Sequence, residues 1–192
     1  MKVYGITGSI ATGKSTVTNY LREKGYLVVD SDKLAYDALT IDEDCIDRVK
    51  KRFDLHGDTI DRKALGRIVF NDPIAKKDLE NIIHPYVINK IKETIHNNQN
   101  LKIIFLDIPL LFESNLEYLC DKIIVVYLNY QEEVKRLMKR DNIDEKYAKI
   151  IISNQMNIED KKRLADIVLD NNKSLENLYQ QIDLMLEGNS NE

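Results

Sequence analysis

The amino-acid sequence predicts an α/β fold: a doubly wound, parallel five-stranded sheet with helices on both faces and with helical insertions. Two features support this prediction. A short apolar strand, a glycine-rich loop and a helical pattern follow one another at the start of the chain. Further on, apolar runs suited to burial on both faces are separated by helical stretches, as in parallel sheets.

The composition favours one domain that binds a small molecule. The 192 residues are 43% hydrophobic, enough for a core, and carry a formal net charge of −4. Proteins that bind nucleic acids or anionic membrane surfaces usually carry an excess of Lys and Arg. Neither kind of partner is therefore expected here, and no protein partner is implied. Cys45 and Cys120 fit neither a disulfide framework nor a metal site. Because no signal peptide or membrane-spanning run is recognisable, we expect a cytoplasmic protein with reduced thiols.

A phosphate-binding loop (P-loop) begins at residue 8. The pattern G-x-x-x-x-G-K-[ST] is matched by Gly8, Ser9, Ile10, Ala11, Thr12, Gly13, Lys14 and Ser15, followed by Thr16. A strand at residues 3–7 precedes the loop, and a helical pattern follows it. Backbone N–H groups can therefore turn toward phosphate oxygens, and the helix presents its positive end to them. Lys14 adds a charge for the β- and γ-phosphates, and the Ser15 hydroxyl is placed to ligate Mg²⁺. A plain glycine turn is the weaker alternative.

Two aspartates follow the second strand. Residues 27–29 form a short apolar run that leads into Asp30 and Asp32, and a helical pattern follows. Ligands of doubly wound sheets bind beyond the carboxyl ends of the strands, so both carboxylates are expected on the same rim as the P-loop. Asp32 is therefore a candidate functional carboxylate. The alternative is that it caps a helix that begins at Lys33.

Residues 41–97 are mostly helical in pattern and rich in charge, which we interpret as a helical substrate region. A turn at residues 56–58 interrupts this region, and Asp72-Pro73 predicts a helix that starts with proline at its first position. His84-Pro85 lies inside a helical run. A helix break with a new helix from Pro85 is one explanation for it, and a functional histidine is the other.

The third apolar run, residues 103–106, ends in Asp107. This aspartate resembles the carboxylate that helps to hold Mg²⁺ opposite a P-loop, with capping or a turn as the alternative. An apolar loop on the same rim follows, formed by Pro109, Leu110, Leu111, Phe112 and Glu113. For this loop, core packing and a wall for a ligand both remain open. Residues 123–128 form the next strand.

Basic charge is concentrated between residues 132 and 163, with nine Lys or Arg against seven Asp or Glu. On the predicted helix of residues 131–140, Arg136 and Arg140 share the face opposite the apolar one. We interpret this segment as a lid whose arginines clamp the transferring group. The alternative is a solvated face on which Arg136 pairs with Glu132.

The chain closes with one more strand and one more helix. Residues 167–169 are a short strand, Asp170 and Asn171 follow it, and an amphipathic helix runs through Leu186. The tail, residues 188–192, is expected to be irregular.

Together these residues resemble the dephospho-CoA kinase family over essentially the whole chain. The resemblance is carried by residues 5–16, 29–32, 68–70, 84–85, 109–113, 139–141, 165–166 and 170–171. The P-loop alone is unspecific, but Asp-x-Asp, His-Pro and Pro-Leu-Leu-Phe-Glu in this order are specific. One departure is Ser9, where a glycine is common, although its backbone N–H remains available to a phosphate.

The resemblance implies a kinase that transfers the γ-phosphoryl of ATP, with Mg²⁺, to the 3′-hydroxyl of dephospho-CoA, the last step of coenzyme A synthesis. It implies a core of residues 1–32, 101–131 and 164–187, a CoA-binding helical region of residues 33–100 and a lid of residues 132–163. Asp32 is the implied base, and Lys14 and Arg140 stabilise the transferring phosphoryl.

The same resemblance implies three sets of contacts. ATP is expected at residues 8–16, Arg136, Asp170 and Asn171. Dephospho-CoA is expected at Asp32, His84, Pro109, Leu110, Leu111 and Glu113. Mg²⁺ is expected at Ser15 and Asp107.

Two other functions are alternatives. A nucleoside or nucleoside monophosphate kinase shares the P-loop, sheet and lid but needs a smaller acceptor pocket, which the long insertion of residues 41–97 weakly disfavours. A nucleotide-driven switch such as a GTPase needs a guanine-selecting N-K-x-D. The nearest match, Asn89-Lys90-Ile91-Lys92, lacks the acid at its fourth position.

Overall fold

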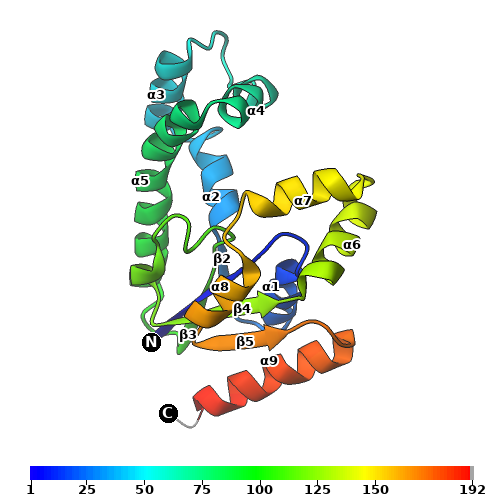
Figure 1. The fold of residues 1–192 in the computed structure, drawn as a ribbon. Coiled ribbons are helices and arrows are strands. Elements are labelled where there is room, and N and C mark those ends of the chain that lie inside the picture. Colours follow the sequence, from blue (N-terminus) through cyan, green and yellow to red (C-terminus); the bar gives the residue numbers. More distant parts are fainter. Residues whose placement is uncertain (191–192) are drawn as a thin grey trace. The chain divides into compact units, whose positions relative to one another are not determined.

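The computed structural model describes residues 1–190, which form two compact units (Figure 1). The first unit holds residues 1–29 together with the chain from residue 100 onward, and the second holds residues 30–99. Within the described residues, no helix is both long and apolar enough to cross a membrane.

The strands of the described chain form one five-stranded sheet in the order β2-β3-β1-β4-β5. They are β1 (Lys2–Gly8), β2 (Leu27–Asp30), β3 (Ile103–Asp107), β4 (Lys122–Tyr127) and β5 (Ile167–Asp170). β1 runs parallel to β3 and β4, and β4 runs parallel to β5. The three inner strands are buried along most of their length, as strands between two helical layers are. The predicted fold class is confirmed.

The strand order creates a switch point beside β1. From β1 the chain crosses by α1 (Lys14–Glu23) to the edge strand β2, whereas from β3 it crosses to β4 on the opposite side of β1. The loops that leave β1 and β3 therefore diverge, and open α/β sheets bind ligands in the crevice between such loops. The P-loop follows β1, and Asp107 ends β3, so both lie at this switch point.

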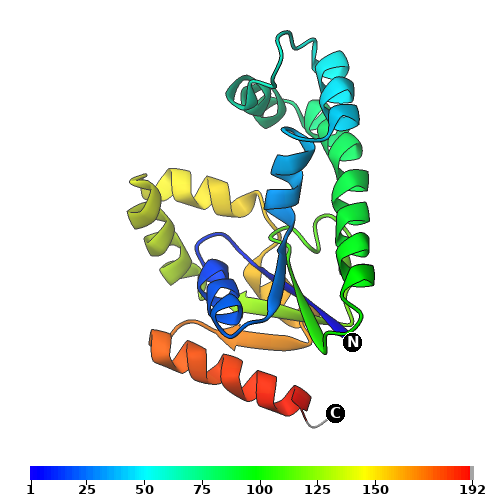
Figure 2. The ribbon, with the colours of Figure 1, turned by 180° about the vertical axis from the view of Figure 1, so that it is seen from behind.

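Helices cover both faces of the sheet. On one face lie α1 and α9 (Leu175–Ser190) (Figure 2). Apolar residues of both helices pack against strand residues such as Phe105 and Ile124. On the other face, α8 (Ile158–Leu164) contacts Tyr127 of β4. The Tyr127 hydroxyl donates a hydrogen bond to the Glu159 carboxylate, and the Lys162 ammonium lies over the Tyr127 ring. Ile124 and Tyr127 are three residues apart on one strand, so they point to opposite faces.

α9 extends further than the sequence predicted. An irregular tail was expected from residue 188, but the helix continues to Ser190. Residues 191 and 192 of the expected tail lie outside the described residues.

α6 (Tyr130–Asp141) and α7 (Glu145–Ser153) form a helical hairpin in the first unit. A small apolar core joins the two helices and consists of Val134, Leu137, Ala148 and Ile152. Ile10 and Ala11, at the tip of the P-loop, pack against this core. The P-loop is therefore held by apolar contacts from the segment expected to be the lid. A 3₁₀ turn, η1 (Glu117–Leu119), lies just before β4.

The second unit is helical, as predicted for the insertion. It contains α2 (Ser31–Ala38), α3 (Glu43–Phe53), α4 (Arg62–Asn71) and α5 (Pro73–Asn97). The four helices are capped by aspartates whose carboxylates accept backbone N–H groups two or three residues ahead: Asp30, Asp42, Asp61 and Asp72. Their apolar sides share one core that includes Val49, Leu65 and Ile82.

Pro85 lies inside α5, so the expected helix break is wrong. Proline removes the N–H that would bond to the Asn81 carbonyl. Asn81 and Pro85 are both exposed, so water can bind that carbonyl, while buried Ile82 and Val87 anchor the helix on either side. The Asn89-Lys92 stretch is also helical, which excludes it as a nucleotide-selecting loop.

Candidate active site

The P-loop makes a sharp turn between β1 and α1. Gly13 has a φ of 97° and Ala11 a φ of 60°, both in the left-handed region. Glycine adopts this region without steric cost, and a Cβ at residue 13 would also lie 2.2 Å from the amide nitrogen of Asn171. Gly13 is the N-cap of α1, and no side chain of the described residues caps this helix start. The positive end of α1 is therefore suited to an anion.

Asn171 holds the P-loop from the end of β5. Its side-chain amide donates to the Thr12 carbonyl at 2.7 Å, and its backbone N–H donates to the Tyr127 carbonyl at 2.8 Å. Arg136 of α6 in turn donates to the Asn171 carbonyl at 3.1 Å. The fold thus brings two of the predicted ATP contacts, Asn171 and Arg136, to the P-loop.

Asp170 has a different environment. Its carboxylate accepts the backbone N–H of Asn172 at 2.8 Å and the Asn172 side-chain amide at 2.7 Å. These bonds shape the turn between β5 and α9.

Lys14 and Asp107 form an ion pair at the switch point. Asp107 is only 5% exposed, so the ammonium of Lys14 offsets the cost of burying its carboxylate. The predicted phosphate lysine and the predicted metal carboxylate are therefore in contact, whereas Ser15, next along α1, is exposed. Within residues 1–190, no group of three or more His, Cys, Asp or Glu could hold a metal ion by itself.

Ser9 makes contacts that a glycine could not make. Its hydroxyl donates to the carboxylate of Glu133 on α6, and it lies 3.3 Å from Oε1 of Gln155. The same Gln155 oxygen accepts the backbone N–H of Ile10 at 3.0 Å. Two side chains from residues 132–163 therefore fix the first half of the P-loop by polar contacts.

Lys161 of α8 is completely buried beside the P-loop. Its ammonium lies 3.3 Å from the Gly8 carbonyl oxygen, 3.2 Å from the Pro109 carbonyl oxygen and 2.9 Å from Oε1 of Glu113. An ammonium has three N–H donors, so these acceptors match its capacity.

Burial shifts the pKa values of two groups in this layer. It raises the pKa of Glu133 to about 7, although the Ser9 hydrogen bond and the charge of Lys161 oppose the shift. It lowers the pKa of Lys161, against the stabilising contact with Glu113. The second carboxylate oxygens of Glu133 and Glu113 are buried without a hydrogen-bond partner among the described residues.

The loop of residues 109–113 is divided between packing and polar contacts. Leu111 and Phe112 are buried, which is the core packing that the sequence left open, and Leu110 is half-buried. Pro109 accepts the Thr7 hydroxyl at 2.9 Å in addition to Lys161. Glu113 also accepts the Met156 backbone N–H at 2.9 Å.

Arg140 lies away from this network. It is exposed and makes a two-pronged ion pair with the adjacent Asp141, at 2.7 and 3.0 Å. Hydrogen bonding to Asp141 raises the pKa of Arg140. The alternative that Arg136 pairs with Glu132 is wrong: Glu132 pairs with Lys135 at 2.6 Å, and Arg136 reaches Asn171 instead.

The remaining predicted residues belong to the second unit. Asp32 is exposed in the first turn of α2. The cap of α2 is Asp30, whose carboxylate accepts the Lys33 N–H at 3.0 Å, so the interpretation of Asp32 as a cap is wrong. His84 is half-buried within α5.

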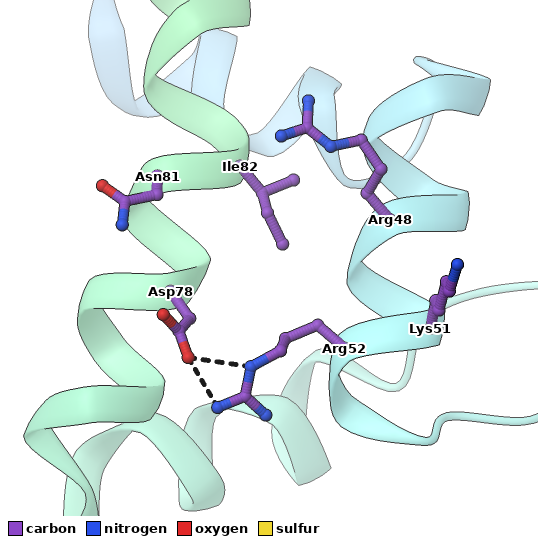
Figure 3. A pocket seen from close by; sticks show the side chains of 6 residues that line it. All are labelled: Arg48, Lys51, Arg52, Asp78, Asn81 and Ile82. Carbon is purple, nitrogen blue, oxygen red and sulfur yellow. Dashed lines mark hydrogen bonds and ion pairs between the residues drawn. The ribbon is translucent and has the colours of Figure 1, made fainter.

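The second unit also has an open hollow of about 520 Å³ between α3 and α5 (Figure 3). It is lined by Arg48, Lys51, Arg52, Asp78, Asn81 and Ile82. Two of its three basic side chains have acidic partners: Arg52 pairs with Asp78 at 2.5 Å, and Arg48 pairs with Asp44 at 3.4 Å. None of the predicted site residues lines this hollow.

The comparison with protein families identifies the chain. The model of the dephospho-CoA kinase family matches residues 2–177. The chain belongs to the dephospho-CoA kinase family. Its curated relatives include a dephospho-CoA kinase of Fusobacterium nucleatum, 42% identical over 168 residues that cover 85% of this chain and 86% of the relative.

Solved structures agree with this membership. A structure from Thermus thermophilus has a TM-score of 0.85 at 36% identity and covers 97% of both chains. A dephospho-CoA kinase from Campylobacter jejuni has a TM-score of 0.72 at 34% identity, over 96% of this chain and 95% of that one. The family resemblance, and the assignment to a kinase family, are confirmed.

The sequence missed Glu133, Gln155 and Lys161, which contact the P-loop in this family member. Each lies in a stretch rich in polar residues, where a charged or amide side chain usually faces solvent. One signal was available: Lys161 follows buried Ile158 by three residues, which places it on the apolar side of α8.

Proposed function

We propose that this protein is a dephospho-CoA kinase, which transfers the γ-phosphoryl of ATP to the 3′-hydroxyl of dephospho-CoA and yields CoA and ADP, the last step of coenzyme A biosynthesis. The observation that carries the proposal is the family match over residues 2–177. The P-loop geometry supports it, because loops of this kind bind the phosphates of nucleoside triphosphates such as ATP.

The proposed ATP site is the loop of residues 8–16 with Lys14 at its end. Its backbone N–H groups and the start of α1 bind phosphate oxygens, and Lys14 exchanges Asp107 for the β- and γ-phosphates when ATP enters. Arg136 and Asn171 lie on the same side of the loop, which supports their role as ATP contacts. Asp170 contributes through the turn that precedes α9.

Mg²⁺ is proposed to bind together with ATP. The Ser15 hydroxyl and the Asp107 carboxylate would hold it together with phosphate oxygens of ATP. This donor set fits Mg²⁺, which prefers oxygen ligands and is usually bound by one or two carboxylates together with substrate phosphates. The ion would neutralise charge that develops on the transferring group.

The proposed acceptor contacts begin with Asp32. This carboxylate accepts the proton of the 3′-hydroxyl, and it lies exposed just after the end of β2, on the rim where such sheets bind ligands. Dephospho-CoA contacts are also proposed for His84, Pro109, Leu110 and Glu113, with Leu111 supporting the loop from within the core.

We further propose that residues 132–163 act as a lid and carry Arg140 to the phosphates, while Glu133, Gln155 and Lys161 of this segment keep their contacts with the P-loop. Its present partner is the neighbouring Asp141 in an exposed pair, and such pairs are weak enough to exchange for a phosphate. The reaction is proposed to occur in the cytoplasm, which agrees with two free cysteines.

An acceptor panel tests the proposal. ADP release is measured with Mg·ATP and, separately, dephospho-CoA, nucleoside monophosphates, nucleosides and pantothenate. We expect turnover with dephospho-CoA. Turnover with a nucleoside monophosphate alone would replace the proposal by its nearest alternative, a nucleoside monophosphate kinase.

A further inference from the structure

The buried ammonium of Lys161 needs an explanation beyond stability. Lysine is almost never fully buried unless it is paired, and Lys161 is 0% exposed. Replacing a buried ion pair by apolar side chains often leaves protein stability unchanged or increases it. The ion pair with Glu113 alone therefore does not explain why a charged side chain is buried at this position.

The other two contacts of Lys161 are with backbone. Gly8 is the last residue of β1 and the first of the P-loop, and its carbonyl lies 3.3 Å from the ammonium. Pro109 follows β3 by two residues, and its carbonyl lies 3.2 Å away. Lys161 therefore joins the two loops that diverge at the switch point.

Each of these loops adjoins one member of the Lys14 and Asp107 pair. Lys14 follows the P-loop that starts at Gly8, and Asp107 lies two residues before Pro109. The Thr7 hydroxyl bonds to the same Pro109 carbonyl at 2.9 Å, which adds a second tie between the loops. Lys161 therefore contacts the backbone on both sides of this pair, close to Lys14 on one side and close to Asp107 on the other.

Resting on the proposed function, we propose that Lys161 is a positioning residue for phosphoryl transfer: it fixes the Gly8 and Pro109 carbonyls, and through them the P-loop and Asp107. Its ammonium is enclosed by protein, so it acts through these loops and not on the reacting atoms. A displacement of about 1 Å at a reacting centre can cost about 100-fold in rate, so loosening these loops affects turnover.

The test replaces Lys161 by methionine, which has a similar length and no charge. We expect Lys161→Met to lower kcat by about 10- to 100-fold, and to change kcat more than the KM for the acceptor, whose proposed contacts Pro109 and Glu113 it also touches. Lys162→Met is the matched control, because Lys162 is the next residue of α8 and exposed, and it should keep wild-type turnover.

A double variant separates positioning from simple ion pairing. Lys161→Met leaves Glu113 buried without its partner and can destabilise the fold, so Glu113→Gln and Glu113→Gln/Lys161→Met are made as well. Melting temperature should recover in the double variant. Its kcat should remain at least tenfold below that of Glu113→Gln, because the Gly8 and Pro109 carbonyls still lack the hydrogen bonds from the Lys161 ammonium.

Two results would overturn the role of Lys161. One is turnover of Lys161→Met within threefold of wild type. The other is a double variant that matches Glu113→Gln within threefold, since the charge of Lys161 would then serve only Glu113. All variants are assayed with whichever acceptor the wild-type protein turns over, so failure of the proposed substrate is a separate result.

Discussion

The P-loop end of the first unit and the helices of the second unit are stabilised by contacts of different range. At the P-loop, Lys161 reaches the Gly8 carbonyl across 153 residues of sequence, and Asn171 reaches the Thr12 carbonyl across 159. In the second unit, the helix starts are fixed by aspartates that bond two or three residues ahead, as Asp72 does with Ile74 and Ala75.

This difference suggests that the proposed ATP site and the proposed acceptor site differ in how far they are preorganised before substrates bind. The proposed ATP half is preorganised, because side chains from several elements fix its backbone before any ligand binds. The proposed acceptor half presents an exposed carboxylate, Asp32, on a locally capped helix. We therefore expect substitutions near the P-loop to alter both rate and stability, and substitutions at Asp32 to alter mainly the rate.

The largest effect is expected for Lys14→Ala. Lys14 stabilises charge between the β- and γ-phosphates more in the transition state than in bound ATP, and loss of one such donor costs about 10²- to 10³-fold in kcat. The variant should remain folded but melt earlier, because Asp107 loses its partner. Assays of ADP release and thermal melting on one preparation test this.

Lys24→Ala is the control for that experiment, since Lys24 lies at the end of the same helix in an exposed pair with Asp183. Near wild-type turnover by Lys14→Ala would show that the P-loop assignment is wrong.

Asp32→Asn is expected to have the next largest effect. A positioned base contributes about 10²- to 10⁴-fold, and asparagine keeps the shape of aspartate but cannot take the proton. We expect kcat to fall roughly 100-fold while ATP affinity and melting temperature change little, because Asp30 and not Asp32 caps α2. Asp37→Asn, on the same helix, should behave like wild type. Activity of Asp32→Asn within about threefold would remove Asp32 from the mechanism, since that is far below what a base contributes.

The same contrast explains what the sequence could predict. The strands, the P-loop and the start of α5 at Asp72-Pro73 arise from neighbouring residues, so local patterns were sufficient to predict them. Burial of Glu133 and Lys161 depends on contacts more than 120 residues away, and on an isolated helix both side chains resemble solvated charges. The error at Pro85 has a related cause: local propensity favours a break, but packing of Ile82 and Val87 keeps α5 continuous.

A smaller effect is expected for Arg140→Lys. A guanidinium binds two phosphate oxygens at once and an ammonium does not, so the variant loses about one hydrogen bond, worth roughly tenfold in kcat. Arg140→Ala should be slower still, and Lys139→Ala is the exposed control beside it. If both Arg140 variants match wild type, this arginine serves only its ion pair with Asp141, and the lid carries no catalytic charge.

The smallest effect is a pH dependence of stability that arises from Glu133. Its pKa is about 7 in the folded protein against an ordinary value of 4.5. The folded chain therefore holds more protons than the unfolded chain between these values, and stability falls as pH rises through that window. A glutamine side chain at this position does not ionise, so Glu133→Gln should gain melting temperature relative to wild type, by roughly 5 °C between pH 5 and pH 8.

Thermal melts at several pH values between 5 and 8 measure this gain. Glu132→Gln is the control: Glu132 lies one residue earlier on α6 and pairs with Lys135 near the surface, so its difference from wild type should not change with pH. If the difference in melting temperature between Glu133→Gln and wild type is the same at every pH in this range, the Glu133 carboxylate is already ionised at pH 5. In that case the charge of Lys161 and the Ser9 hydroxyl compensate its burial in full, and the layer behind the P-loop is a balanced ionic network.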